Sequence, residues 1–378
     1  WSCSDANLPC TFRHVIDQAS NTLPSGAYSA TSQATQATGT GTYWIHVQAM
    51  DPAGNESSVF HASAVLDNQA PNPPALALLN PASSPGNDTT PTFRATGLSA
   101  GTTVSLHEGG CGTASLASAQ IPTNVFAANL TASAISGDGP YTFYVKSTDS
   151  LGNSSCSSPV SYELDTAAPV VTITGPTPGT INQAGSATYA ITYAGAASYA
   201  LDALKVLLTA SGTASCSKSV SNGTTASATV TLSGCTGSGT VSLAIAAGAA
   251  SDAAGNASIQ TAAATALNVD NTPPAAPTSL ALVNPASSPG NNPTPVIRVS
   301  GVASGDGVSI HSDASCTLPS QKGSATASGA TVDITSSNLG ADGVYTFYAK
   351  STDSLGNASN CSSASVSYEL DTAAPVVT

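Results

Sequence analysis

Charged residues are scarce in this chain. They make up 8% of its 378 residues, and eight Lys and Arg stand against 21 Asp and Glu, which gives a formal net charge of −13. A protein that binds nucleic acid or an anionic membrane surface needs clustered basic side chains. Here the basic residues stand singly along the chain. The composition therefore argues against both partners and fits an acidic, cation-binding or simply soluble surface better.

Long amphipathic patterns are also missing. Apart from one run near residues 199–208, no stretch shows the 3.6-residue period of an α-helix. Several segments instead alternate apolar and polar residues, as half-buried β-strands do. No segment has the pattern of a signal peptide, a membrane span or a lipidation motif, and the chain opens on Trp1. We therefore expect an all-β protein that is a piece of a longer chain, with no membrane insertion in this segment.

A short motif, D-x-x-G-N, recurs four times, at residues 51–55, 149–153, 252–256 and 353–357. An alternating segment precedes every copy except the third, where the pattern is less clear; residues 141–148 are an example. Asp can bond to the backbone two residues on, and Gly and Asn tolerate a positive φ, so each copy is predicted to be a turn that closes a strand. Four copies in this length predict repeats of about 100 residues, the size of a β-sandwich.

Two kinds of linker separate the repeats. Asp67 and Asp270 begin linkers that lead to nearly identical N-P-A-S-S-P-G-N openings, whereas Asp165 and Asp371 begin D-T-A-A-P followed by V-V-T. The array therefore alternates two domain types with a period of about 205 residues. The expected domains are 1–67 (the C-terminal half of a sandwich), 68–167 (first type), 168–270 (second type), 271–373 (first type) and 374–378 (the start of a further domain). Proline fixes φ and favours extended backbone, so these linkers predict an extended rod.

The eight cysteines fall two to a repeat. The expected pairs are Cys3 with Cys10, Cys111 with Cys156, Cys216 with Cys235, and Cys316 with Cys361. The second and fourth pairs have the same separation of 45 residues, and closing such a loop contributes about 4 kcal/mol. One disulfide per domain in an oxidising compartment explains this regularity, whereas zinc knuckles do not. We expect an exported protein whose disulfides supplement cores built from small Ala and Val rather than from aromatic residues.

These features together resemble the bacterial Ig-like repeats of large cell-surface adhesins and biofilm-associated proteins. The likeness rests on the linker Asp followed by Pro, on strands such as Tyr345-Thr346-Phe347-Tyr348-Ala349, and on the D-x-x-G-N turn. It implies tandem Ig-like β-sandwiches that form an extended extracellular stalk, which in some relatives is stiffened by Ca²⁺ between domains. The cysteine pair in each repeat departs from many such stalks.

The acidic residues supply a candidate Ca²⁺ site. The turn Asp and the linker Asp of the four repeats account for eight of the 21 acidic residues. In an Ig-like sandwich the turn before the last strand faces the preceding linker, because the first strand begins at that end. The expected carboxylate pairs are Asp67 with Asp149, Asp165 with Asp252, and Asp270 with Asp353. With backbone carbonyls, and with Glu163 or Glu369 as an added ligand, such a pair offers the oxygens that Ca²⁺ takes. The alternative is that these residues merely cap turns.

Other candidate chemistry is weak. Gly97-Leu98-Ser99-Ala100-Gly101 matches G-x-S-x-G, but that motif needs a strand-to-helix turn, and the corresponding repeat position holds Ala303 instead of Ser99. The five histidines lack metal-ligand spacing, and exposed hairpin positions are expected for His107 and His311. Sequons such as Asn256-Ala257-Ser258 are attributed to chance.

We therefore expect a non-enzymatic structural stalk of a secreted or surface-bound bacterial adhesin. Its partners would be further repeats of the same longer chain, and a host or surface ligand that the sequence leaves unknown. The alternative is a subunit of an extracellular filament or sheath, in which packing against other copies is the function. No catalytic residue is expected.

Overall fold

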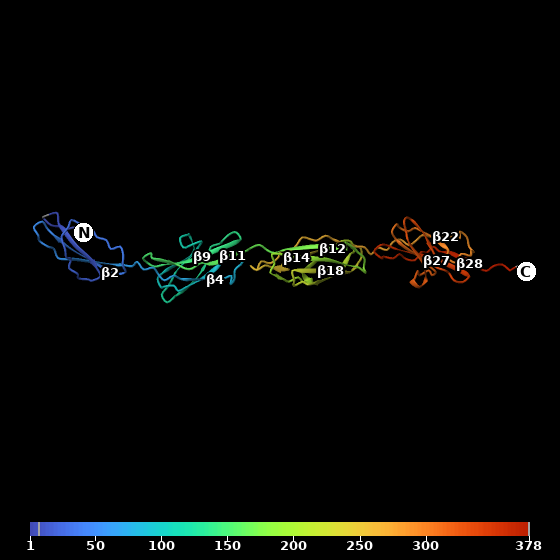
Figure 1. Ribbon diagram of the computed structural model, residues 1–378, viewed down its shortest axis with the longest axis horizontal. Helices are drawn as coiled ribbons and strands as arrows, with labels where there is room; N and C mark the ends of the chain where they lie inside the picture. Colours follow the sequence, from blue (N-terminus) through green and yellow to red (C-terminus); the bar gives the residue numbers. More distant parts are fainter. Residues whose placement is uncertain (7, 377–378) are drawn as a thin grey trace. The chain divides into compact units, whose positions relative to one another are not determined.

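The computed structural model describes residues 1–6 and 8–376, and its regular secondary structure is almost entirely β-strand (Figure 1). The chain divides into two compact units, residues 1–167 and residues 168–378. The doubtful helical run near residues 199–208 contains two strands and a single 3₁₀ turn, so the all-β prediction is confirmed. The expected start of a further domain at 374–378 falls partly on residues 377–378, which lie outside the described residues.

Residues 75–164 form a sandwich of two antiparallel sheets, coloured cyan to green in Figure 1. One sheet has the order β4-β5-β8, and the other has the order β7-β6-β9. Two further strands, β10 and β11, pair with β9 on the side opposite β6. In immunoglobulin lettering these sheets are A-B-E and C′-C-F-G. The strands are β4 (Ala75–Asn80), β5 (Thr92–Thr96), β6 (Thr103–Glu108), β7 (Ser115–Gln120), β8 (Ala127–Thr131), β9 (Gly139–Thr148), β10 (Ser154–Cys156) and β11 (Val160–Leu164).

Residues 279–370 repeat this arrangement with sheets β22-β23-β26 and β25-β24-β27-β28. The elements are β22 (Ser279–Asn284), β23 (Val296–Ser300), β24 (Gly307–His311), the 3₁₀ turn η2 (Leu318–Ser320), β25 (Gln321–Thr326), β26 (Thr331–Thr335), β27 (Gly343–Thr352) and β28 (Val366–Leu370). The two regions expected to be one domain type therefore share one strand order.

A tyrosine fixes the start of the F strand in both of these domains. Tyr141, near the start of β9, donates its hydroxyl hydrogen toward the carbonyls of Ser136 (2.6 Å) and Gly137 (2.8 Å). Tyr345 makes the equivalent contacts at the start of β27. This tyrosine corner is a hallmark of Ig-like sandwiches, and it ties the loop before strand F to the strand itself.

Residues 170–269 form a sandwich of a different strand order. Its sheets are β12-β14-β18-β17 and β13-β21-β19-β16, with a small β15-β20 ribbon beside them. In Ig lettering the sheets are A-B-E-D and A′-G-F-C. The elements are β12 (Val170–Thr177), β13 (Thr180–Ile181), β14 (Ser186–Ala194), β15 (Ser198–Tyr199), η1 (Ala203–Lys205), β16 (Val206–Ala210), β17 (Ser215–Ser221), β18 (Ser227–Thr236), β19 (Gly239–Ile245), β20 (Ala250–Ser251) and β21 (Leu267–Val269).

The strand after strand C distinguishes the two domain types. In the first type this strand, β7 or β25, pairs with strand C and enlarges the sheet that holds strand F. In the second type the corresponding β17 pairs with β18 and enlarges the opposite sheet. The alternation in the linkers thus accompanies a real difference in topology.

The first 67 residues hold a three-stranded antiparallel sheet in the order β1-β2-β3. Its strands are β1 (Thr11–Asp17), β2 (Gly41–Met50) and β3 (Phe60–Leu66). β2 leads into the turn at residues 51–55 just as β9 leads into the turn at residues 149–153. Phe12 and Val47, which lie on one face of this sheet, are each 7% exposed.

The cores correct one expectation, because aromatic side chains occupy their centres. Few aromatic residues are present, yet several of those in the complete domains are fully buried, and burial stabilises at roughly 25 cal/mol per Å² of apolar surface. The largest fully buried side chains include Phe93, Phe143, Tyr162, Tyr189, Phe347 and Tyr368. The cores are rich in Ala and Val, as predicted, but the expectation that aromatic residues contribute little to them is wrong.

The expected exposure of His107 and His311 is also wrong, since their exposed fractions are 6% and 2%. A register shift between Leu106 and His107 in the β6–β7 pairing breaks the alternation, so that both of these neighbours are buried. The Nδ1 of His107 lies 2.9 Å from the carbonyl oxygen of Thr113, to which it donates. Its Nε2 lies 2.8 Å from the Ser105 hydroxyl oxygen. His311 makes the equivalent contacts, so a buried imidazole holds the loop in each copy.

The two first-type domains differ at one buried hydroxyl, which yields a matched pair of predictions. Ser351 donates to the buried Asp306 Oδ2 at 3.0 Å, whereas the equivalent Ser147 Oγ has no partner among the described residues. Thr102 replaces Asp306 in that copy and donates to the carbonyl of Ser99.

Ser351→Ala should therefore destabilise its domain by about 1–3 kcal/mol, because a buried carboxylate loses its donor. Ser147→Ala should cost far less. Hydrogen exchange in denaturant, resolved by domain, measures both, and equal losses would contradict this account.

A pH dependence follows from His311. Burial lowers the pKa of His311 below its ordinary value, because the charged imidazolium is poorly solvated there. The stability that this group contributes is present above the unfolded-state pKa of about 6.5 and is lost as the pH falls through the lower folded-state pKa. His311→Gln should therefore flatten the acid-side loss of stability of residues 271–373, measured by hydrogen exchange across that pH range. A substitution in the other unit, His14→Gln, should leave that slope unchanged.

Candidate functional site

The four D-x-x-G-N turns share one hydrogen-bond pattern. In the copy after β9, Asp149 Oδ1 accepts from the backbone N–H groups of Leu151 and Asn153, both at 2.9 Å. Asp149 Oδ2 accepts from the Asn153 side-chain amide at 2.8 Å. Gly152 occupies the turn with a φ of 96°, where a side chain would be strained. The Asp carboxylate thus organises the turn, as the sequence predicts.

The side-chain amide of the turn asparagine reaches beyond its own turn. Asn153 Nδ2 also donates to the backbone carbonyl of Asp67, the linker aspartate that precedes this domain, at 2.9 Å. In the other unit Asn357 Nδ2 donates to the carbonyl of Asp270 at 2.9 Å and to Asp353 Oδ2 at 2.9 Å. The amide therefore joins the linker to the turn in both places.

This arrangement confirms the topological part of the prediction within each unit. The turn before the last strand does face the preceding linker, at Asp67 and at Asp270. The joining atoms are different from those expected, because an amide meets a backbone carbonyl and no pair of carboxylates is needed. We call the amide with its two acceptors, the turn carboxylate and the linker carbonyl, the asparagine bridge.

Further contacts flank the asparagine bridge. In the first unit the Ser155 hydroxyl donates to the carbonyl of Asn72 in the linker at 3.2 Å. In the second unit the Asn182 side-chain amide donates to the turn carbonyl of Leu355 at 2.7 Å, and the backbone N–H of Gln183 donates to Asn271 Oδ1. The turn in the second unit is thus held from the linker and from the domain before it.

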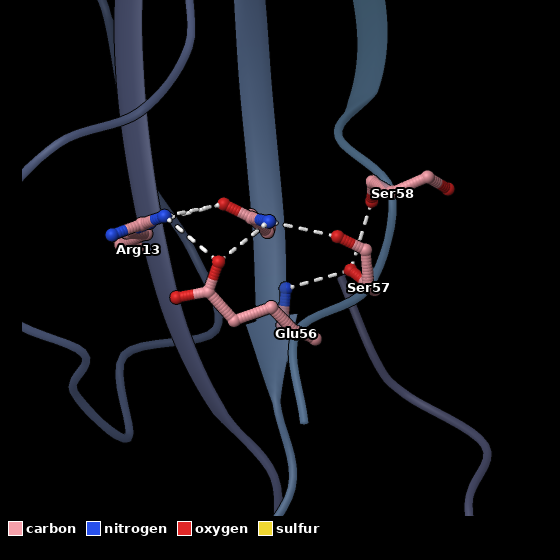
Figure 2. Close-up of polar contacts among 6 residues, drawn as sticks. Arg13, Glu56, Ser57 and Ser58 are labelled. Atoms are coloured by element: carbon pink, nitrogen blue, oxygen red, sulfur yellow. Dashed lines mark hydrogen bonds and ion pairs between the residues drawn. The ribbon is translucent and has the colours of Figure 1, made fainter. Parts of the chain in front are cut away.

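Sequence reasoning missed a serine two residues after the turn asparagine. The Ser57 hydroxyl accepts from the backbone N–H of Ala49 at 3.0 Å, beside the contacts of Arg13 and Glu56 shown in Figure 2. Ser258 and Ser359 accept in the same way from the residue two positions before their turn Asp. The serine at this position in all four repeats was the signal that could have revealed it.

The serine and the asparagine explain the sequons at the turns. Asn256-Ala257-Ser258 has the form N-x-S because both polar side chains are used: Asn256 donates to Asp252 Oδ2 at 2.9 Å, and Ser258 accepts from the backbone N–H of Ala250 at 3.2 Å. The attribution of this sequon to chance is therefore wrong. It is part of a longer turn motif, D-x-x-G-N-x-S.

The residues predicted to hold Ca²⁺ are engaged mainly within their own turns. Asp67, Asp165 and Asp270 each accept from the backbone N–H two residues ahead, and the turn aspartates bind their asparagines. Glu163 is exposed on β11. The expected pair of Asp165 and Asp252 belongs to different units and stays a prediction.

The donor set at the asparagine bridge does not resemble a cation cage. The point where the Asp149 carboxylate and the Asp67 carbonyl converge is filled by an N–H donor, which takes the role a cation would have. Within the described part of the chain, no group of three or more His, Cys, Asp or Glu side chains is placed to hold a metal ion. Ca²⁺ binding at the junctions remains a prediction.

The pKa of the turn carboxylates reflects the same bonds. The side-chain hydrogen bond from Asn153, supported by backbone N–H groups, holds the pKa of Asp149 below its usual value. Asn55 lowers the pKa of Asp51 for the same reason. A hydrogen bond to the ionised form stabilises the charge, so the bridge is complete when the turn Asp is ionised.

Four disulfides join Cys3 to Cys10, Cys111 to Cys156, Cys216 to Cys235, and Cys316 to Cys361, and the structure has no free cysteine among the residues it describes. In the first-type domains the disulfide ties the loop after strand C to the segment after the turn. In the second type it joins the neighbouring strands β17 and β18.

The G-x-S-x-G match at residues 97–101 does not form a nucleophile elbow. Ser99 is exposed on a tight turn between β5 and β6, where its carbonyl accepts from Thr102, and this is not the strand-to-helix turn that a nucleophile elbow requires. Among the helices of the described residues, none has the length and apolar character needed to cross a membrane.

Comparison with known proteins finds similar structures. They include a tetra-tandem repeat from the extending region of a large adhesion protein (TM-score 0.35, 19% identity, 96% of this chain and 92% of that chain). A BSP domain of a biofilm-associated protein is also similar (TM-score 0.27, 11% identity, 89% of this chain and 76% of that chain). So are the FN1–FN3 domains of chicken CNTN1 (TM-score 0.29, 13% identity, 80% of this chain and 99% of that chain). No protein-family model matches the chain, and no curated protein sequence matches it.

Two substitutions of Asn357 test whether the asparagine bridge holds the linker: one removes the amide donor, and the other replaces it with a carboxylate. Asn357→Ala removes the donor and should raise amide exchange in the linker after Asp270, with a local loss of about 1 kcal/mol. Asn357→Asp keeps the shape but faces Asp353 with a second carboxylate, so its loss should be larger at neutral pH and should shrink in acid.

The control for this test is Asn360→Ala, an exposed position in the same loop. It should leave exchange in the linker unchanged. Equal effects of all three substitutions would mean that the bridge does not hold the linker.

Proposed function

We propose that this chain is a non-enzymatic structural segment of a bacterial extracellular adhesin, a stalk that spaces a binding tip from the cell surface. The observation that carries the proposal is the asparagine bridge. It binds the linker backbone to the turn of the following domain in each unit, at Asn153 and at Asn357. A stalk needs linkers of defined geometry, and a side chain that holds the linker backbone supplies one.

The disulfides and the composition support the same proposal. One disulfide per repeat suits a protein that works outside the reducing cytosol. The low charge and the high Ser and Thr content suit a surface that makes few specific contacts along its length. The adhesion and biofilm proteins among the similar structures agree with this setting.

Calcium would be an addition to this stalk and not a requirement of it. Of the expected carboxylates, that of Asp149 lies at the bridge and accepts from the Asn153 amide, whereas that of Asp67 accepts from the backbone N–H of Gln69. If Ca²⁺ binds there, a chelator should lower the melting temperature of the chain. An unchanged melting curve would leave the asparagine bridge as the link between linker and turn.

The proposal predicts that loss of the asparagine bridges loosens the chain without unfolding its domains. The double variant Asn153→Ala/Asn357→Ala should keep its circular dichroism spectrum, while small-angle X-ray scattering should show a wider spread of conformations than in the parent chain. The matched control, Asn129→Ala/Asn360→Ala, changes two exposed asparagines and should scatter like the parent.

Two results would count against the stalk. The first is a scattering experiment in which the parent chain and the double variant are equally flexible, because the asparagine bridges would then not hold the linkers. The second is an image of the native cell surface with ordered multi-chain fibres in place of separate threads. Such fibres would favour the filament or sheath.

A further inference from the structure

Two histidines of the first sheet face each other with their ring nitrogens in contact. His46 on β2 and His61 on β3 are directly paired in the antiparallel register, so their side chains lie on the same face of the sheet. The Nδ1 of His46 meets the Nδ1 of His61, with the ring centroids 4.7 Å apart. Neither residue takes part in the asparagine bridge.

The surroundings of His46 fix the form of its ring. His46 is fully buried, and its Nε2 lies 2.9 Å from the carbonyl oxygen of Ala19 and 3.3 Å from Asp17 Oδ1. Both partners are acceptors, so Nε2 carries the proton. The Nδ1 of the neutral ring therefore presents a lone pair toward His61.

This is the environment in which proteins place a metal-binding histidine. A ligating imidazole donates its other ring N–H to a carboxylate or a backbone carbonyl, which fixes the tautomer and the ring orientation. His46 has both a carboxylate and a carbonyl on that side, from Asp17 and Ala19.

His61 can provide the second lone pair. It is exposed, so its proton can sit on the solvent-facing Nε2, and the Nδ1 atoms of both rings then converge on one point. Two lone pairs in contact repel, and a cation between them relieves the repulsion. Because a metal–nitrogen bond is about 2.0–2.1 Å long, the His61 ring has to swing outward, which an exposed side chain can do.

We propose that His46 and His61 form a two-histidine site for a divalent transition-metal ion of the Cu²⁺ or Zn²⁺ class. Imidazole nitrogen prefers these ions over Ca²⁺ or Mg²⁺. Among the described residues no third His, Cys, Asp or Glu joins the pair, so water completes the coordination. The site is therefore weaker and more labile than a closed structural zinc site.

The proposal is tested on the whole chain with Cu²⁺ and Zn²⁺ as probes. Calorimetry should detect one bound Zn²⁺ per chain, and the Cu²⁺ electron paramagnetic resonance spectrum should show coupling to two imidazole nitrogens. His61→Ala, at an exposed position, should weaken binding at least 10-fold and remove one nitrogen from the spectrum. Lowering the pH should weaken binding as well, because protons compete with the metal ion for the imidazole nitrogens.

The control is His14→Ala, since His14 on β1 contacts Trp1 and is not part of the pair. It should bind both ions like the parent chain. Unfolding curves of the variants show that each is folded. No saturable uptake in the parent, or equal uptake in parent and His61→Ala, would overturn the proposal and leave the two rings sharing a proton.

Discussion

The side-chain amide of the turn asparagine is the interaction on which the junctions depend. One of its contacts completes the turn by meeting the Asp carboxylate, and the other reaches the linker carbonyl, as in Asn153 with Asp149 and Asp67. Because one planar group serves both acceptors, the turn and the linker are positioned by the same atom. The glycine before the asparagine and the serine after it follow from that requirement: the first allows the positive φ, and the second secures the strand that leads into the turn. The repeated motif is therefore a device for joining domains as well as for ending a strand.

The two domain types carry the same turn motif on different topologies. In the first type the strand after C extends the sheet that contains strand F; in the second it extends the opposite sheet. The turn motif lies after strand F in both, after β9 and β27 in one type and after β19 and β20 in the other. Strand F and its turn are therefore kept while the strand after C changes sheets, and the two asparagine bridges, at Asn153 and Asn357, belong to first-type domains.

The sequence predicted the repeats, the all-β fold and the end of the domain that faces the linker, because each depends on pattern and topology. It was less informative about which atoms a side chain contacts. The pairing of the Asp67 and Asp149 carboxylates around Ca²⁺ stays a prediction, but the Asn153 amide that joins the linker to the turn was missed, since composition marks only the acidic residues as unusual. His107 and His311 were expected at exposed hairpin positions because they end a strand just before a cysteine, and the register shift that accompanies their burial is a backbone irregularity without a clear sequence signature. The buried aromatics were underrated for a similar reason: a low aromatic content says little about where those few side chains lie.

The disulfides of the first-type domains have a consequence for a chain under tension. Cys111 and Cys156 enclose a separation of 45 residues, and Cys316 and Cys361 enclose the same number. If pulling unfolds such a domain, the enclosed segment does not lengthen, which withholds about 150 Å of contour length at roughly 3.4 Å per residue. A reducing agent that cleaves the disulfide would make this contour length available for extension. The covalent loop thus limits how far a first-type domain extends before the load passes to its neighbours.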